Sequence, residues 1–334
     1  MHAIGRNLSL PYHDRSMRSL DQPAAPMTLQ QLRAFLAVAE SGSFREAARG
    51  LGVSQAGLTG SLQTLEAALG VRLLERSTRG AQLTAAGRQL LPRARLIAQE
   101  TGRIRDEALQ SRGSTEGGTL QVGLGPTPTA VLLQRVVPDF HARFPGVRLK
   151  LLSGFYEHLQ PALQQGVIEL AVTALPDEGV GPGLEVRRLF RSELVVIGRP
   201  GHPAASARSL RELAACEWVL IGSPGGPGGT ITRFHAEQGL PPPKIAAGCE
   251  SFTQVAALVG ATDWLALVPA VMVQRGLLGS GIAPLRLKER APRLHNGVVR
   301  RTGAPLTPAA AAFAAMCESC ARIAAPLAGL AGAG

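Results

Sequence analysis

The strongest constraint on the fold is a change in hydrophobic periodicity near residue 118. Between residues 27 and 110, apolar side chains recur every three to four positions, which is the spacing of amphipathic helices. After the Gly- and Ser-rich stretch 111–118, short strand-like runs alternate with helical segments. The sequence therefore predicts a helical N-terminal part, a flexible linker and an α/β C-terminal part.

The helical part begins with two short helices joined by a tight turn. Thr28-Leu-Gln-Gln31 and Ser43-Phe-Arg-Glu46 have the form of capping boxes, and Ser54 has the form of an N-cap for a third helix. The buried positions that we expect are Leu32, Phe35, Leu36, Ala39, Phe44, Ala47, Ala48, Leu51, Leu58, Leu62, Leu65 and Leu69. This pattern is typical of a helix-turn-helix, although a three-helix bundle with no DNA role has the same spacing.

A wing and a long helix follow. Two apolar stretches around a tip at Arg76, Arg79 and Gly80 predict a two-stranded wing. Thr84 then caps a helix to about Gln110, in which Pro92 and Gly102 predict a bend. Its coiled-coil-like seam predicts dimerisation, with packing on the same chain as the alternative. The seam consists of Leu83, Ala86, Leu90, Ala94, Ile97, Thr101, Ile104 and Ala108.

The C-terminal part predicts a parallel, doubly wound sheet in two α/β lobes joined by crossing strands. The expected strands are Thr119–Leu124, Val147–Leu152, Leu170–Ala174, Leu194–Gly198, Trp218–Gly222, Ile245–Gly248, Leu265–Val268 and Gly297–Arg301. The expected helices are Val131–Phe144, Leu159–Gln165, Thr230–Gln238, Thr253–Gly260 and Pro308–Ala325. Two such lobes predict a ligand cleft between them, at the carboxyl ends of strands.

Composition narrows the class of partner. The 35 basic and 24 acidic residues give a net charge of +11, which favours an anionic partner such as nucleic acid. Four cysteines are too few for a disulfide scaffold, and no apolar run is long enough to span a bilayer, so we expect a cytoplasmic protein. Residues 1–26 lack the apolar region of a secretory signal; we expect a disordered extension, with Met17 or Met27 as alternative starts.

No catalytic, cofactor or metal constellation emerges. Gly123-Leu-Gly125 lacks the third glycine of a dinucleotide fingerprint, and the Gly-rich stretch 222–229 lacks the Gly-Lys-Ser/Thr of a P-loop. Cys317 and Cys320 have no second pair at zinc-ligand spacing and are expected to be small core residues. We therefore expect a binding protein that is not an enzyme and holds no cofactor.

These residues resemble the LysR-type transcriptional regulators over about residues 27–328. The resemblance lies in Leu32-Arg-Ala-Phe-Leu-Ala-Val-Ala-Glu-Ser-Gly-Ser-Phe-Arg-Glu-Ala-Ala-Arg-Gly-Leu-Gly-Val-Ser-Gln55, Leu65-Glu66, Gly70-Val-Arg-Leu-Leu-Glu-Arg76 and Leu83-Thr84-Ala-Ala-Gly87. Phe144-Pro145-Gly-Val and Leu265-Ala-Leu-Val-Pro269 are more loosely similar. The resemblance implies a winged helix-turn-helix, a dimerising linker helix and a two-lobed effector domain similar to periplasmic solute-binding proteins, assembled as dimers or tetramers.

The third helix carries the candidate DNA contacts. Ala56 and Gly60 depart from the family, which often has proline and a longer side chain at these positions. Gln55 and Gln63 could pair with adenine, Thr59 could meet a thymine methyl, and Gly60 could allow close approach of the backbone to DNA. The arginines could equally be solvated surface residues. The candidates are Ser54, Gln55, Thr59, Gly60 and Gln63 for the groove, and Arg49, Arg72, Arg76 and Arg79 for phosphate.

The candidate effector residues lie at strand ends. We expect a small anion at the start of the helix near Thr127 and Thr129, where N–H groups and the helix dipole favour negative charge. Phe155 and Phe252 could contact an apolar body. The candidates are Pro126, Thr127, Thr129, Ser153, Gly154, Phe155, Thr173, Ser223, Ser251, Phe252 and Pro269.

Together these observations predict a sequence-specific regulator of transcription controlled by an effector. The expected divisions are a DNA-binding domain at 27–83, a linker helix and hinge at 84–118, effector lobes at 119–190 and 191–291, and a return at 292–328. Expected partners are promoter DNA, a small molecule and a second copy of the chain, with RNA polymerase as a candidate and no membrane. The alternatives are a solute-binding or enzymatic α/β protein with an N-terminal assembly helix, and a basic nucleoid-type protein without sequence preference.

Overall fold

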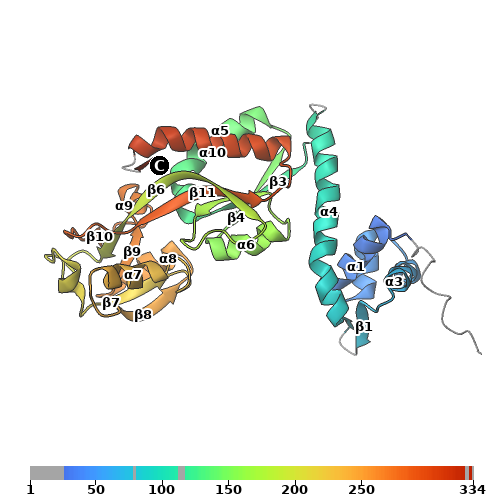
Figure 1. The fold of residues 1–334 in the computed structure, drawn as a ribbon, viewed down its shortest axis with the longest axis horizontal. Helices are drawn as coiled ribbons and strands as arrows, with labels where there is room; N and C mark the ends of the chain where they lie inside the picture. The colour runs from blue at the N-terminus through green and yellow to red at the C-terminus, as the bar shows by residue number, and fades with distance from the viewer. Residues whose placement is uncertain (1–25, 78–79, 112–116, 328–330, 333–334) are drawn as a thin grey trace, which may run out of the picture. The chain divides into compact units, whose positions relative to one another are not determined.

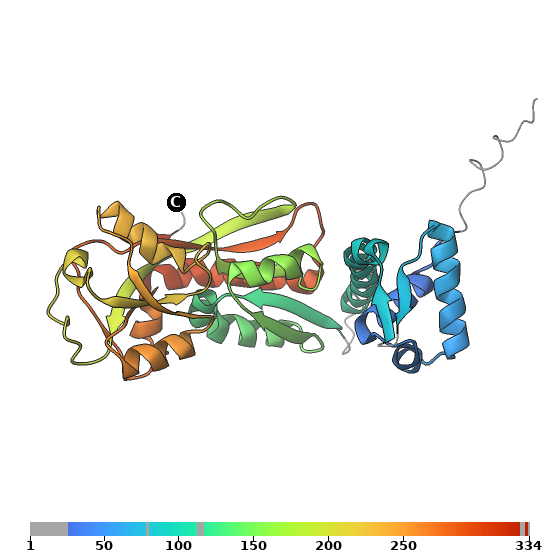
Figure 2. The ribbon, with the colours of Figure 1, turned by 90° about the horizontal axis from the view of Figure 1, so that it is seen from below.

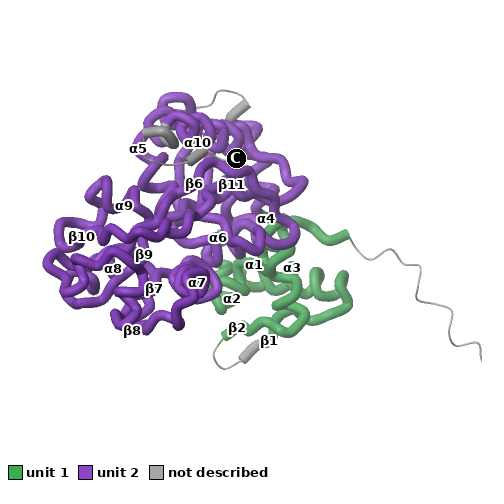
Figure 3. Tube along the Cα trace, turned by 60° about the vertical axis from the view of Figure 1, so that its left-hand side comes forward, with its two compact units in different colours: residues 1–98 green, residues 99–334 purple. Residues whose placement is uncertain are grey.

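A computed structural model describes residues 26–77, 80–111, 117–327 and 331–332. The chain divides into two compact units, residues 1–98 and 99–334 (Figure 3). The division falls inside the long linker helix, not at the predicted limits 84 and 118, which stay predictions. Residues 1–25 of the expected extension, Arg79 and most of the expected flexible linker lie outside the described residues.

The first unit begins with the predicted tri-helical core. Its helices are α1 (Leu29–Ser41), α2 (Phe44–Leu51) and α3 (Gln55–Leu69). Thr28 and Gln31 form the complete capping box, whereas Ser43 supplies only its own half, by accepting from the Glu46 N–H. The expected core is confirmed at eight of twelve positions: Ala39 and Phe44 are half-buried, and Leu51 and Leu69, at helix ends, are 41% and 38% exposed. Each leucine precedes a C-capping glycine, so the chain turns away before the side chain can be covered.

The predicted wing and long helix are also present. The wing pairs β1 (Leu74–Ser77) with β2 (Gly80–Leu83) as an antiparallel hairpin. Helix α4 (Ala85–Ser111) starts where Thr84 Oγ1 accepts from the Gly87 N–H at 3.0 Å. The helix runs through Pro92 and Gly102 without a break.

The second unit contains the two predicted lobes (Figure 1). Lobe 1 has helices α5 and α10 over one face of its sheet and α6 over the other (Figures 1 and 2). Its elements are β3 (Thr119–Leu124), α5 (Pro126–Arg143), β4 (Arg148–Ser153), α6 (Tyr156–Gln164), β5 (Leu170–Ala174), β11 (Arg293–Arg301) and α10 (Pro308–Leu327).

Lobe 2 repeats the strand order of lobe 1. In each lobe three parallel strands place the first in the middle, as β4-β3-β5 and β8-β7-β9. Its elements are the 3₁₀ helix η1 (Leu210–Leu213), β7 (Glu217–Ile221), α7 (Gly229–Glu237), β8 (Lys244–Cys249), α8 (Phe252–Ala261), β9 (Leu265–Pro269), α9 (Ala270–Gln274) and β10 (Ala283–Pro284). A short strand β12 (Ala331–Gly332) pairs with the strand that joins the lobes.

The predicted parallel strands are present within each lobe, but the sheet as a whole is mixed, because the two crossing strands run in opposite directions and pair antiparallel with their neighbours. Strand β6 (Leu184–Gly198) pairs with β11 through residue 193 and with β9 from residue 194. The chain leaves lobe 1 along β6 and returns along β11, so these strands must be antiparallel to each other. The predicted strand Leu194–Gly198 covers only the lobe 2 end of β6. Within the described residues, none of the helices has the length and apolarity needed to traverse a bilayer.

Candidate functional site

Helix α3 presents an uncharged surface on the side opposite its buried leucines. Gln55, Gly60 and Gln63 are exposed, while Leu58, Leu62 and Leu65 are buried. The half-buried Thr59 donates its hydroxyl to the Gln55 carbonyl at 2.9 Å, which leaves its methyl group as the part able to contact a partner. The arrangement fits contact with base edges in a major groove.

Other predicted contacts differ in what their side chains do. Ser54 Oγ accepts from the Gly57 N–H at 3.1 Å, so the hydroxyl caps α3. Arg49 and Arg72 are exposed, as phosphate contacts require. Arg76 lies on β1, but its side chain, like the whole of Arg79, is outside the described part of the chain.

A groove of about 590 Å³ lies between α3 and the wing. It brings together Thr59, Gln63 and Arg72 from the predicted set. It also contains Glu66, a residue for which we predicted no role. Glu66 Oε1 accepts from the N–H groups of Leu73 and Leu74, at 2.7 and 3.1 Å, and thereby holds the wing against α3. In the sequence, the one feature that pointed to Glu66 was its place in the Leu65-Glu66 pair that resembles the family.

In the second unit, three connected cavities lie along the junction of the lobes. A narrow crevice of about 30 Å³ shares lining residues with a cavity of about 730 Å³ at one end and with another of about 260 Å³ at the other. Phe155 of lobe 1 and Phe252 of lobe 2 meet edge to face across the crevice, with ring centroids 6.3 Å apart. These cavities correspond to the predicted cleft.

The predicted effector residues gather along this cleft with one exception. The 730 Å³ end and the crevice are lined by Pro126, Thr127, Thr129, Ser153, Gly154, Phe155, Ser251, Phe252 and Pro269. Ser223 lines the 260 Å³ end. Thr173 lines none of the three cavities: it is 1% exposed, and its hydroxyl packs against Gly125 without a hydrogen-bond partner.

The start of α5 offers fewer donors than we predicted. Pro126 and Pro128 have no N–H, and the Thr129 N–H and hydroxyl both donate to the Gly125 carbonyl. Thr127, 4% exposed at the crevice, is therefore the residue of this turn that can offer a backbone N–H to a ligand. The expectation of several free N–H groups is wrong, because proline removes the donor while favouring the helix start.

The two ends of the cleft carry different charges. Glu157, Asp177 and Glu178 line the 260 Å³ end, where Arg233 is paired with Asp177. The 730 Å³ end contains the guanidinium of Arg275, which donates to the Ala130 carbonyl at 2.5 Å, together with Glu250. The charges of Arg275 and Glu250 balance at one end, whereas carboxylates outnumber Arg233 at the other, so an anion is disfavoured at the carboxylate end and finds a cation at the Arg275 end.

Comparison with known families decides the identity of the chain. A family model described as "LysR substrate binding domain" matches residues 113–321, more than half of the chain. A second, "Bacterial regulatory helix-turn-helix protein, lysR family", matches residues 29–88. The chain belongs to the LysR family of transcriptional regulators. In this LysR regulator, the two matched regions contain both the α3 surface and the cleft.

Individual relatives agree with this assignment. The SDS degradation transcriptional activation protein of Pseudomonas sp. (strain ATCC 19151) is 34% identical over 85% of this LysR regulator and 94% of the relative. A probable hydrogen peroxide-inducible genes activator of Streptomyces viridosporus is 32% identical over 83% and 89%. The structure of full-length CbnR in complex with its target DNA has a TM-score of 0.66 and 28% identity, covering 88% of this chain and all of CbnR.

Proposed function

We propose that this protein binds promoter DNA through α3 and the wing, as a homo-oligomer in the cytoplasm, and responds to a small effector in the cleft without transforming it. The main observation in support is that the same chain contains an exposed, uncharged α3 surface and a cavity between two lobes. DNase footprinting on the DNA upstream of its own gene tests the proposal. A short protected site supports it, and uniform coating would instead indicate a nucleoid-type protein.

Helix α4 supplies the proposed dimerisation surface. Ile97 and Ile104, one heptad apart on the predicted seam, are 39% and 68% exposed. Large apolar side chains exposed at this spacing favour a partner helix. Dimer or tetramer assembly, and contact with RNA polymerase, stay predictions.

We propose further that the effector is a small anion whose charged group lies between Thr127 and Arg275. This placement keeps the anion away from the three carboxylates of the opposite end. Phe155 and Phe252 provide an apolar surface beside it. Charge-assisted hydrogen bonds of this kind contribute about 1.5–3 kcal/mol each.

Thr127→Val and Arg275→Gln should each weaken binding of the effector about tenfold or more, because the first removes a hydroxyl donor and the second a positive charge that would face the anion. Calorimetry with a series of carboxylates, sulfonates and the matching neutral amides identifies the ligand and measures the loss. Arg233→Gln is the matched control, since it removes a guanidinium from the carboxylate end. Amides that bind as tightly as the acids, or an equal loss in Arg233→Gln, would refute the anion site.

The names of some relatives mention hydrogen peroxide, which raises a second candidate, a response to peroxide. Cysteine is the side chain that would carry such a response by oxidation. The geometry opposes it: none of the four cysteines lines the cleft, and Cys249, Cys317 and Cys320 are buried. Burial raises the pKa of all four thiols, that of Cys317 to about 12. The thiolate is the reactive form, and a pKa of about 12 leaves only ~10⁻⁴ of Cys317 ionised at pH 8.

We therefore expect hydrogen peroxide to leave operator affinity unchanged. Four thiols should still be titratable after denaturation, and any slow oxidation should accelerate as the pH rises toward the raised pKa values. Gel shift and thiol labelling of the treated protein check both points, with a free cysteine peptide as the oxidisable control. Loss of two thiols together with altered DNA binding would establish a peroxide switch instead.

A further inference from the structure

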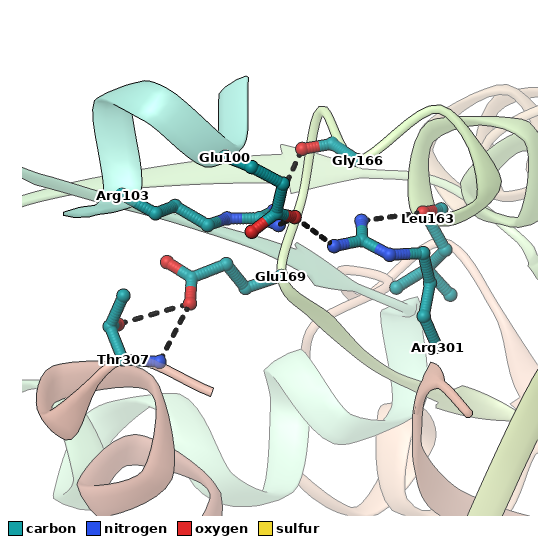
Figure 4. Close-up of polar contacts among 7 residues, drawn as sticks. All are labelled: Glu100, Arg103, Leu163, Gly166, Glu169, Arg301 and Thr307. Carbon is teal, nitrogen blue, oxygen red and sulfur yellow. Dashed lines mark hydrogen bonds and ion pairs between the residues drawn. The ribbon is translucent and has the colours of Figure 1, made fainter. Parts of the chain in front are cut away.

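The second half of α4, residues 99–111, makes polar contacts with lobe 1 inside the second unit (Figure 4). Glu100 accepts from Arg301 at 2.6 Å and also from Arg103. Arg103 Nη2 donates to the Gly166 carbonyl at 2.8 Å, and Arg301 Nη1 donates to the Leu163 carbonyl at 3.2 Å. We call Glu100, Arg103 and Arg301 the Glu100 cluster.

The charges of this cluster depend on one another. The side chains of Arg103 and Arg301 are only 12% and 13% exposed, and both guanidinium groups share the Glu100 carboxylate. Burial and the neighbouring Arg103 lower the pKa of Arg301, whereas Glu100 and Glu169 act in the opposite direction. Neutralising Glu100 would leave two nearly buried cations without their shared partner, which is costly.

The Glu100 cluster lies next to buried polar groups of lobe 1. Glu169 lies beside the Glu100 cluster, directly before β5, and accepts from the N–H and hydroxyl of Thr307 at 3.2 and 3.0 Å (Figure 4). Thr307 in turn caps α10 by accepting from the Ala310 N–H at 3.3 Å. The residues around this half of α4 thus come from α6, from β11 and from the segments directly before β5 and α10.

Gly118, directly before β3, lies close to the middle of the same helical half. It has φ of +81°, and a Cβ there would lie 2.2 Å from the Asp106 carboxylate. Only glycine allows the chain to approach α4 this closely at this point. Residues 99–111 thus lie against the rest of the second unit at Asp106 as well as at the Glu100 cluster.

Strand β11 connects the cleft to the Glu100 cluster. Leu294 lines both the crevice and its carboxylate end, and Arg301 lies seven residues later, roughly 23 Å along an extended strand. β11 is paired on both sides, with β5 and β6. The pairing of β11 with β6 shifts register once, between Asn296 and Gly297, where Leu189 of β6 is the extra residue, while the pairing with β5 stays regular. The bulge therefore lets β6 bend locally beside a regular β11. The buried side chain of Asn296 leaves its Oδ1 without a hydrogen-bond partner at this point.

We propose that the Glu100 cluster makes residues 99–111 of α4 a rigid part of lobe 1, and that β11 transmits changes at the cleft to α4 through Arg301. Residues 99–111 belong to the same compact unit as lobe 1. The transmission step rests on the proposed effector function; the rigidity of residues 99–111 does not.

Hydrogen exchange of the full chain tests the first half of the proposal. Glu100→Gln and Arg301→Gln should each speed amide exchange in residues 99–111 about tenfold, and the effect of the double variant should be less than the product of the two, because both remove the Glu100–Arg301 pair. Exchange in residues 29–69 should not change. Arg105→Gln is the control, since it removes an exposed charge from the same helical half. If Arg301→Gln fails to fold, Arg301→Lys should show a smaller acceleration, because it retains the charge but not the forked donors.

If amide exchange in the Glu100→Gln and Arg301→Gln variants is no faster than in Arg105→Gln, the rigid attachment is wrong.

The transmission step is tested by Ser223→Trp, which places an indole in the carboxylate end of the cleft as the probe. This variant should alter exchange in residues 99–111 at least threefold, and the change should vanish when Arg301→Gln is added. No response, or a response that survives Arg301→Gln, refutes transmission. Neither experiment uses DNA or effector, so a negative result here is distinguishable from a failure of the proposed function, which footprinting and calorimetry test.

Discussion

Operator affinity should fall roughly 10³–10⁵-fold between 50 and 200 mM salt if a dimer makes about 6–10 phosphate contacts. The reason is counterion release: each phosphate that an arginine neutralises frees condensed cations, and added salt opposes that gain. The net charge of +11 supplies the required excess of basic groups. Fluorescence anisotropy with a footprinted operator, over a salt series, measures the slope directly.

Arg72→Ala should reduce that slope by about 2 in a dimer, one contact from each protomer, and should weaken binding to all sequences equally. Arg72 is exposed beside Gln63 in the groove between α3 and the wing. Arg211→Ala, which removes an exposed arginine from lobe 2, is the control and should leave the slope unchanged. A loss confined to one base pair would show instead that Arg72 reads sequence.

Local signals predicted the first unit well. The caps at Thr28, Ser54 and Thr84 and the buried stripe of α3 are confirmed, because a cap or a helical stripe is a property of neighbouring residues. The exposed leucines at positions 51 and 69 show the limit of this reasoning. Periodicity gives the direction of a side chain, but coverage depends on what packs against the helix end.

The mixed sheet could not be predicted from local pattern. Residues 184–193 of β6 do not keep a polar and apolar alternation after Arg187, and they include three arginines, so they resemble loop rather than buried strand. Their strand state comes from pairing with β11, more than 90 residues later. Strand direction is likewise a property of the connection between lobes and not of either strand's composition.

The site shows the same division between local and long-range information. Strand-end position alone placed all but Thr173 of the effector candidates on the cleft. It could not show that the Thr129 hydroxyl is used by the Gly125 carbonyl, or that Arg275 from a distant helix joins the same cavity. Glu66 and Glu100 were missed because each acts on groups that the sequence does not bring together.

Gly60→Ala should stabilise the fold and weaken DNA binding at the same time. Glycine inside a helix costs about 1 kcal/mol relative to alanine, and a Cβ at Gly60 would meet nothing within 4 Å. The protein itself therefore gives no reason for glycine at this exposed position. If the α3 backbone lies against DNA there, an added methyl group costs about 1–3 kcal/mol, which corresponds to a loss of affinity of about 5- to 150-fold.

Thermal melting and gel shift of the same preparation separate the two effects. Gly102→Ala is the matched control, because Gly102 is also exposed within a helix and a Cβ there would meet nothing within 4 Å. It should raise the melting temperature by a similar amount without changing operator affinity, as long as the oligomeric state is unchanged. Higher helix propensity raises stability at either glycine, whereas steric exclusion lowers affinity only where the backbone lies against DNA. Only a glycine at the DNA surface therefore gives both results. A Gly60→Ala protein that melts higher and binds as tightly as the original would show that the backbone of α3 stands clear of the bases.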